Sequence, residues 1–398
     1  MSLVEKIKSE KIPTIIFGAG IVGQALHQAC TNAGINIECF CDNNLNKTKK
    51  NLWNTPVIHV PKLKNQYPDA NFLISAADIK DVKNQLAEMG YHNLYAGSLL
   101  LRDFDTYRHN FSAPADFVRY TVDTAILCQD NYLNPDKLFL RSLDIIVTER
   151  CSLKCQDCSN LMRYYPNPKD CNMQELMRYI DKFCGIIDEI NEFRVLGGEP
   201  FMNKEAHSVI KRLIEEPKAK KVVIYTNGTI VPKENQMEEM KSEKTLFLIT
   251  NYGLISRNLG GLVESLEKNG IKYYIQNVGG WTDCSKIEKH NRSQEQQQKI
   301  FGKCCAKNTV TLSKGSLYRC PFSANAARLG AVPDLTGDYV NLFDEKIIAN
   351  EMKSRIRSFL LDKKFLETCD FCNGRSFGDP EIQPAIQADK PLAYQKYS

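Results

Sequence analysis

The chain has little excess charge, no long apolar run and no internal repeat. It carries 52 basic and 47 acidic side chains over 398 residues, a formal net charge of +5, which is too small to argue for a nucleic-acid or membrane-surface partner. No apolar run approaches the roughly eighteen residues from which a membrane-spanning helix is inferred. The one biased stretch is the short glutamine-rich run at 294–298. We therefore expect no nucleic-acid partner and no membrane partner.

A targeting segment is also missing from the sequence as it stands. The first ten residues, Met-Ser-Leu-Val-Glu-Lys-Ile-Lys-Ser-Glu, alternate in charge and lack an apolar core, so we expect no signal peptide. Cysteine, in contrast, is abundant, with fifteen residues. In a large chain without a secretion signal, this number favours metal or cluster ligands in a reducing cytoplasm over a disulfide scaffold. The length predicts two or three domains.

Three cysteines stand close together directly after the apolar run 143–147. They are Cys151, Cys155 and Cys158, separated by three and then by two residues. Zinc sites usually draw four ligands in two pairs, and no histidine stands here at ligand spacing. Iron–sulfur clusters take cysteine thiolates and normally use four. A trio therefore suits a cubane cluster that keeps one iron open, while three structural or zinc-binding thiols are the alternative.

The Cys-x3-Cys-x2-Cys loop after a strand resembles the cluster loop of the radical S-adenosylmethionine (radical SAM) enzymes. A second motif of that family is present as Gly197-Gly198-Glu199-Pro200, after the apolar residues 193–196. The resemblance implies that this edge binds the methionine amino group of SAM, and that SAM chelates the open iron of a catalytic 4Fe-4S cluster. One electron, from a donor such as flavodoxin or ferredoxin, then cleaves SAM to a 5′-deoxyadenosyl radical. One position departs from the family pattern, because Asp157 stands where an aromatic residue often packs by the adenine.

Residues 1–100 predict a Rossmann-like domain. A buried strand at 12–17 is followed at once by a turn with Gly18, Gly20 and Gly23, then by a helical pattern and a second strand that ends at Asp42. This is a Gly-x-Gly-x-x-Gly turn with an acid about twenty residues further on, an arrangement that brings backbone N–H groups close to a phosphate. The segment resembles the domain at the front of bacterial sugar acyltransferases, which can hold a nucleotide-sugar. The alternative is a Rossmann-like domain that serves docking or assembly and binds no nucleotide.

Strands and helices alternate over residues 141–290, after a connector at 101–140 with a helix at 120–133. The pattern indicates parallel βα units and hence an α/β fold. The resemblance implies a partial (βα)6 radical SAM barrel, although a sixth strand is not obvious. The predicted strands are 143–147, 193–196, 221–225, 245–249 and 272–275, and the predicted helices are 173–190, 205–215, 234–240 and 259–269.

Polar residues follow several of these strands, at the end where barrel enzymes carry their chemistry. Glu199 is the candidate partner of the methionine ammonium group, through a charge-assisted bond. Thr226, Asn227 and Asn251 stand where the family usually contacts ribose or substrate. Their sequences, Asn-Gly and Asn-Tyr-Gly, are also ordinary turn formers. No side chain is assigned as a catalytic acid or base.

A second group of cysteines lies in the predicted small C-terminal domain, residues 291–398. Counted from Cys305, it reads Cys-x9-Gly-x4-Cys, with a hairpin predicted at 309–318, and it resembles the opening of the auxiliary-cluster extension called SPASM or, when shortened, twitch. The short form fits better because no cysteine follows Cys372. One of the adjacent residues Cys304 and Cys305 would ligate a second 4Fe-4S cluster for electron transfer, together with three cysteines further along the chain. A four-cysteine zinc site is the alternative. The candidate ligands are Cys304, Cys305, Cys320, Cys369 and Cys372.

These features together predict a radical SAM enzyme that abstracts hydrogen from a small molecule. The front domain favours a sugar or nucleotide-sugar in surface-glycan biosynthesis. A peptide-modifying maturase is the alternative, and a zinc-stabilised scaffold without enzyme activity is a third reading. Arg150 and Arg194, which lie beside the motifs, are candidates to meet a carboxylate or phosphate.

Overall fold

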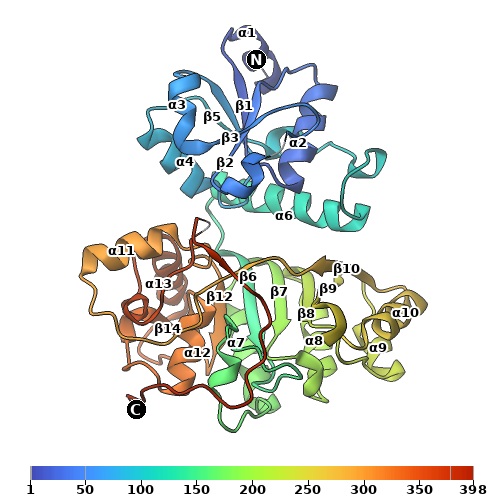
Figure 1. The fold of residues 1–398 in the computed structure, drawn as a ribbon, viewed down its shortest axis with the longest axis vertical. Coiled ribbons are helices and arrows are strands. Elements are labelled where there is room, and N and C mark those ends of the chain that lie inside the picture. Colours follow the sequence, from blue (N-terminus) through green and yellow to red (C-terminus); the bar gives the residue numbers. More distant parts are fainter. Residues whose placement is uncertain (1, 50, 377, 398) are drawn as a thin grey trace. The chain divides into compact units, whose positions relative to one another are not determined.

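The computed structural model describes residues 2–49, 51–376 and 378–397 (Figure 1). The chain divides into two compact units, Met1–Lys137 and Leu138–Ser398, and each is described by itself. The helix of the predicted connector, observed as α6 (Ala115–Leu133), belongs to the first unit. In the described part of the chain, no helix combines the length and the apolar character that crossing a membrane requires.

The first unit is a five-stranded parallel sheet with helices around it (Figure 1). The strand order is β3-β2-β1-β4-β5, so the chain winds outward from β1 in both directions. The strands are β1 (Thr14–Phe17), β2 (Cys39–Asp42), β3 (Val57–His59), β4 (Asn71–Ile74) and β5 (Leu94–Ala96), and the other α-helices of the described residues are α1 (Leu3–Ser9), α2 (Ile21–Asn32), α3 (Leu63–Gln66), α4 (Ile79–Glu88) and α5 (Ser98–Leu101).

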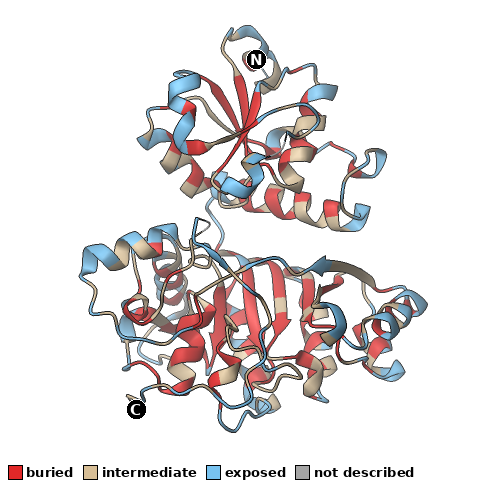
Figure 2. Cartoon of the chain, in the orientation of Figure 1, coloured by how far each residue is buried: buried red, intermediate tan, exposed pale blue. Residues whose placement is uncertain are grey.

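Every residue of β1, β2 and β4 is buried, as expected for a parallel sheet covered on both faces (Figure 2). Alternate residues enter two separate cores. Ile16 belongs to one core, with Leu73 of the neighbouring strand, and Ile15 belongs to the other, with Phe72. The continuous apolar runs of the sequence therefore arise because both faces are buried.

The second unit is built on an eight-stranded sheet with the order β10-β9-β8-β7-β6-β12-β13-β14. Its strands are β6 (Phe139–Ile146), β7 (Glu189–Leu196), β8 (Ala219–Thr226), β9 (Thr245–Asn251), β10 (Lys272–Asn277), β12 (Val310–Ser313), β13 (Ser316–Tyr318) and β14 (Tyr339–Asn341), and a small separate pair is formed by β11 (Trp281–Thr282) and β15 (Glu381–Ile382). Its helices are α7 (Met173–Ile186), α8 (Ala206–Ile214), α9 (Glu234–Met240), α10 (Leu259–Asn269), α11 (Gln294–Lys303), α12 (Pro321–Leu329) and α13 (Ala349–Leu361).

Strands β10 to β6 are parallel and joined by helices, so the five predicted strands and their βα alternation are confirmed. The sheet stays open and does not close into a barrel. A sixth parallel strand is present. It is β12, which pairs with β6 on the side away from β7, so it does not lie next to β10. The predicted hairpin, observed as β12 and β13, thus extends the same sheet.

The predicted helix 173–190 is four residues too long. Helix α7 begins after Asn172, whose side chain accepts the Glu175 N–H at 3.1 Å, and it ends at Ile186 because Ile187 is extended, with φ −67° and ψ 147°. Ile187 and Ile190 are buried in the same core as the helix, so their helical spacing was misleading: Ile190 already belongs to β7.

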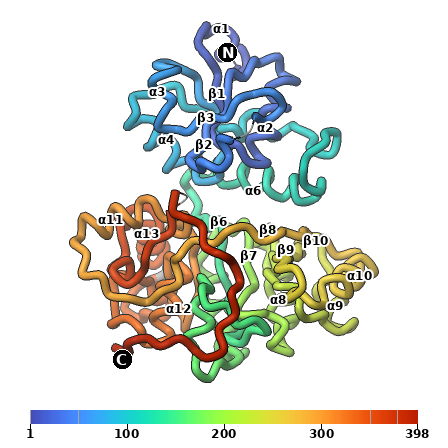
Figure 3. Tube along the Cα trace, in the orientation of Figure 1, coloured from blue at the N-terminus to red at the C-terminus, as the bar shows by residue number. Residues whose placement is uncertain are grey.

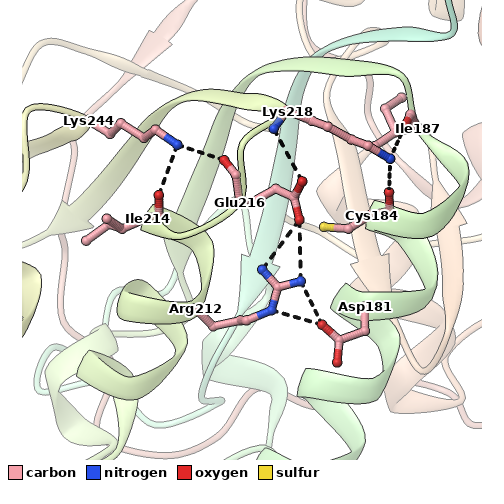
Figure 4. Close-up of polar contacts among 8 residues, drawn as sticks. All are labelled: Asp181, Cys184, Ile187, Arg212, Ile214, Glu216, Lys218 and Lys244. Carbon is pink, nitrogen blue, oxygen red and sulfur yellow. Dashed lines mark hydrogen bonds and ion pairs between the residues drawn. The ribbon is translucent and has the colours of Figure 1, made fainter.

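Two lysines beside the buried Glu216 connect the C-terminal ends of α7 and α8 to the sheet (Figure 4). Lys218 Nζ donates to the carbonyls of Cys184 and Ile187, at 2.6 and 2.9 Å. Lys244 Nζ donates to the carbonyls of Ile214 and Glu216, at 3.0 and 2.7 Å. These bonds satisfy carbonyls that have no partner within the helix, and place cations at helix C-termini. They hold the helices at the edge of the sheet where β8 and β9 begin.

Candidate functional site

A cavity of about 430 Å³ lies at the opposite edge, where β6, β7, β8 and β9 end. The loops after parallel strands meet at one edge, which is where such sheets bind ligands. Its wall holds all three cysteines of the predicted cluster loop, both glycines of the Gly-Gly-Glu-Pro motif, and residues from the C-terminal region. The site residues on this wall are Cys151, Cys155, Cys158, Gly197, Gly198, Thr226 and Asn227.

The Gly-Gly edge lies directly against the cysteine loop. The Gly198 N–H donates to the Thr148 carbonyl at 3.1 Å, and the Glu199 N–H donates to the Arg150 carbonyl at 2.9 Å. A Cβ atom on Gly198 would lie 2.2 Å from the Arg150 oxygen and 2.7 Å from the Cys151 Cβ. Glycine is therefore required at this position because the backbone of one loop occupies the space of a side chain.

Glu199 lies one layer behind the cavity wall. Its side chain is 0% exposed, and both carboxylate oxygens accept from Thr226 Oγ1 at 2.9 Å, while one also accepts the Asn227 N–H at 2.8 Å. Burial raises the pKa of Glu199 to about 7, although these donors act to lower it. In this structure Glu199 orients the Thr226–Asn227 turn, and the cavity wall next to it is the Gly197–Gly198 backbone. Pro200 begins the short helix that follows and is buried.

The end of β9 contributes Thr250 and Tyr252 to the wall, whereas Asn251 between them is not part of it. Asn251 caps its own turn by accepting the Gly253 N–H at 2.9 Å and donates to Asn277 on β10. Tyr252 and Trp281 form an edge-to-face pair with ring centroids 6.0 Å apart. Both line the cavity and provide the aromatic surface that Asp157, also on the wall, does not.

The three cysteines form no disulfide, and each sulfur accepts at least one hydrogen bond from an N–H group. Burial raises the pKa of Cys151, Cys155 and Cys158, and each sulfur receives donors that act in the opposite direction: Leu153 for Cys151, Gln387 for Cys155, and Met162 and Asn160 for Cys158. Asn227 Nδ2 adds a longer contact of 3.7 Å to Cys151 Sγ. Buried thiols that become thiolates on metal binding need such donors.

In the described ranges, no three His, Cys, Asp or Glu side chains surround a single metal position. A cubane cluster does not need that geometry, since each thiolate ligates a different iron. Three free cysteines on one loop, all on one cavity wall with N–H donors at sulfur, fit the cluster that the resemblance implies.

One ion pair, between residues of β6 and β7, forms part of the cavity wall. Arg194 Nε donates to Asp144 Oδ1 at 2.6 Å, the guanidinium lies over the Tyr225 ring at 5.4 Å, and all three residues line the cavity. Arg150, in contrast, does not line it and pairs with Asp170 at 3.0 Å. Arg375 lines it from the C-terminal region, a contribution that no local pattern signals.

The second cysteine group gathers in the C-terminal region. Cys320 packs against one core cluster together with Cys369 and against another together with Cys372, and burial is the largest cause that raises the pKa of Cys320. Cys320 is the N-cap of α12, where its sulfur accepts the Ser323 N–H at 3.2 Å, and Cys372 Sγ accepts the Gly374 N–H at 3.3 Å. Arg292 Nη1 holds the last pair by donating to the carbonyls of Cys369 and Cys372, both at 2.8 Å.

The adjacent residues Cys304 and Cys305 point to different places. Cys304 is the C-cap of α11 and does not line the cavity of the first cysteine group. Cys305 instead lines the cavity of the first cysteine group, together with Cys284. The sequence spacing allowed either residue as a ligand, and only the turn after α11 separates them in space.

The glycine turn of the first unit has the geometry of a tight strand-to-helix connection. Gly18 has φ +101°, and a Cβ on Gly23 would lie 1.9 Å from the Gly18 oxygen. Gly20 precedes α2 as its N-cap, without a side-chain cap. Asp42 accepts the Ala19 N–H at 2.9 Å and pairs with Lys47 at 3.0 Å, so this acid supports the turn itself.

Glu199 should make the stability of the second unit depend on pH. Because its pKa is raised from 4.5 to about 7, the folded protein keeps a proton that the unfolded chain releases between these values. The free energy of unfolding should therefore fall as pH rises through this window, by about 3 kcal/mol at about 1.4 kcal/mol per unit. Glu199→Gln should remove this fall in denaturant titrations at pH 5 and pH 8. The exposed Glu205→Gln is the control, and equal slopes in wild type and Glu199→Gln would refute the assignment.

Comparison with known proteins locates the family signal on these strands. The profile of the Radical SAM superfamily matches residues 145–274, from the end of β6 to β10. A GTP 3′,8-cyclase from Ectopseudomonas mendocina (strain ymp) is 33% identical over 88 residues, 22% of this chain and 26% of that protein. A GTP 3′,8-cyclase from Clostridium acetobutylicum is 26% identical over 141 residues, 32% of this chain and 43% of that protein. The chain thus spans less than half the length of these curated relatives.

The solved structures that match this chain do so at low similarity. BtrN in complex with AdoMet and 2-DOIA is 14% identical, with a TM-score of 0.41 over 59% of this chain and 93% of that chain. Streptococcus suis SuiB bound to S-adenosylmethionine is 14% identical, with a TM-score of 0.30 over 76% of this chain and 84% of that chain. The profile match over residues 145–274 includes both the cysteine loop and the Gly-Gly-Glu-Pro motif, so this part of the chain carries the similarity to the Radical SAM superfamily.

Proposed function

We propose that this protein reductively cleaves SAM and uses the resulting radical to take a hydrogen atom from a small-molecule substrate. One observation carries the proposal: the three cysteines of the loop and the Gly-Gly edge meet on the wall of one cavity, at the carboxyl edge of a parallel sheet. A 4Fe-4S cluster held here by the three cysteines, with SAM bound beside it, would supply a 5′-deoxyadenosyl radical. The low-potential electron would come from a cytoplasmic donor such as a flavodoxin or ferredoxin.

The residues of the wall divide into groups with different tasks. Cys151, Cys155 and Cys158 would hold the cluster, which leaves one iron for SAM. The backbone of Gly197–Gly198 would accept the methionine ammonium, and Thr226 and Asn227, oriented by the buried Glu199 carboxylate, would face the ribose. The Tyr252–Trp281 pair offers an apolar surface for adenine, since aromatic rings stack or pack edge-to-face with one another.

A second 4Fe-4S cluster in the C-terminal region is the second part of the proposal. Cys304, Cys320, Cys369 and Cys372 would be its ligands, and Cys305 would remain a free thiol in the catalytic cavity. The support is that Cys320 packs in one core cluster with Cys369 and in another with Cys372, that N–H donors reach Cys320 and Cys372, and that Cys305, unlike Cys304, lines the catalytic cavity. Four protein ligands would leave no open iron, which suits electron transfer. A four-cysteine zinc site is the competing assignment.

For the substrate we propose a sugar or nucleotide-sugar in surface-glycan biosynthesis. The first unit supports this choice, because its 3-2-1-4-5 strand order and glycine turn are those of Rossmann-like nucleotide-binding domains. The uncapped start of α2 and Lys47 beside Gly20 would suit a phosphate. The curated relatives are named for GTP, itself a nucleotide.

Anaerobically reconstituted and reduced protein should form 5′-deoxyadenosine from SAM. Cys155→Ala should abolish this product, because the loop then offers two thiolates and the cluster is lost. Cys184→Ala, which removes a thiol from the core of α7, is the matched control and should retain both iron and product. Product formation by Cys155→Ala at the wild-type rate, measured by chromatography, would contradict the proposed cluster ligands.

The adjacent cysteines provide a sharper test of the second cluster. Cys304→Ala should lose about four of about eight irons and the corresponding paramagnetic signal, whereas Cys305→Ala should keep the full iron content. Iron and zinc analysis with electron paramagnetic resonance measures both. The reverse result would exchange the two assignments, and zinc in place of the second set of irons would support the zinc site.

The substrate class can be tested on the same wild-type protein. Nucleotide-sugars should raise the rate of 5′-deoxyadenosine formation, because an enzyme couples cleavage to a bound substrate, and short peptides and free sugars serve as comparison sets. Stimulation by peptides alone would replace the glycan proposal with that of a peptide maturase.

A further inference from the structure

The C-terminal segment crosses the cysteine loop, far from it in sequence (Figure 3). It first pairs with β11 through β15 and then runs antiparallel to residues 154–156. The Gln156 N–H donates to the Ile386 carbonyl at 2.9 Å, and the Ala388 N–H donates to the Lys154 carbonyl at 2.7 Å. We call residues 385–397 the C-terminal strap.

Beyond this crossing, the strap is anchored on the chain that follows the cysteine loop. The Leu392 N–H donates to the Arg163 carbonyl at 2.9 Å. Tyr394 contacts Tyr164 edge-to-face, with centroids 5.9 Å apart, and Tyr397 contacts Phe371 in the same manner at 5.5 Å. Because the strap is held on both sides of the loop, its position over Cys155 is determined by the fold.

Gln387 joins the strap to a cysteine sulfur. Its side-chain Nε2 donates to Cys155 Sγ at 3.2 Å, and its Oε1 accepts the Lys154 N–H at 2.6 Å. The same Nε2 donates to the Ala385 carbonyl at 2.7 Å, and Ala385 has φ +58°. The amide is thus fixed at three points, with one N–H directed at the sulfur.

We propose that Gln387 is a positioning residue that raises the reduction potential of the cluster bound by Cys155, and that the strap closes the solvent side of the cysteine loop. This inference rests on the proposed function, since it requires a cluster on Cys151, Cys155 and Cys158. Hydrogen bonds to ligand sulfurs and exclusion of solvent are two of the factors that set the potential of such clusters. An N–H···S bond stabilises the reduced, more negative cluster, because it offsets charge on sulfur.

Two variants separate the hydrogen bond from the fold of the strap. Gln387→Glu keeps the size of the side chain and an acceptor for the Lys154 N–H, but it replaces the donor with a negative oxygen. Gln387→Ala removes the donor without adding charge. The control is Gln383→Glu, which makes the same charge change at an exposed residue of the same segment, before the strap begins.

The measurement is a redox titration followed by electron paramagnetic resonance, on the signal that changes when SAM is added. The midpoint should shift to more negative potential in Gln387→Ala and further in Gln387→Glu, while Gln383→Glu should match wild type. In cluster-free protein, the limiting rate at which iodoacetamide alkylates Cys155 at high pH, where the thiol is ionised in both proteins, should be higher in Gln387→Ala than in wild type, because the amide no longer covers the sulfur or hydrogen-bonds to it; mass spectrometry measures this rate. An unchanged midpoint in both Gln387 variants at full iron content would overturn the proposal, as would unchanged alkylation.

Failure of the underlying function has a different appearance. Wild-type protein would then bind no SAM-responsive cluster, and there would be no midpoint to compare. A wild-type protein that cleaves SAM, together with Gln387 variants of unaltered midpoint, would leave the radical SAM assignment intact and remove the role of Gln387.

Discussion

The site depends on the close contact between two loops, the cysteine loop after β6 and the Gly-Gly edge after β7. Their backbones exchange hydrogen bonds at 2.9–3.1 Å, and this approach is possible only because Gly198 has no Cβ. Each loop alone is an irregular segment with unsatisfied polar groups. Together they form a wall on which the three cysteines and both glycines line the same cavity.

A layer of buried polar groups supports that wall from behind. The Glu199 carboxylate holds the Thr226 hydroxyl and the Asn227 N–H, and Asn227 reaches back to Ser152 at 3.1 Å. Three successive strand ends are thus connected through one acid. Its full burial is tolerated because donors surround it, and the raised pKa reflects the remaining cost of burying its charge.

The C-terminal region completes the same cavity. Strand β12 extends the sheet beside β6, and Cys305, Thr309 and Arg375 line the cavity. The strap residue Gln387 contacts Cys155 of the cysteine loop. The region therefore does more than carry a second group of cysteines. It closes a site whose cysteine loop lies far earlier in the sequence, with 232 positions between Cys155 and Gln387.

Local sequence determined the strands, most of the helices and the two cysteine groups, because hydrophobic period, turn residues and ligand spacing are short-range properties. It also marked Gly197, Gly198, Thr226 and Asn227, which follow strands directly. Only the tertiary structure placed Cys305 and not Cys304 on the cavity wall, moved Glu199 behind the wall, left Asn251 off it, and paired β12 with β6. Each of these depends on which surfaces meet across long sequence separations, where a one-residue difference in a turn redirects a side chain.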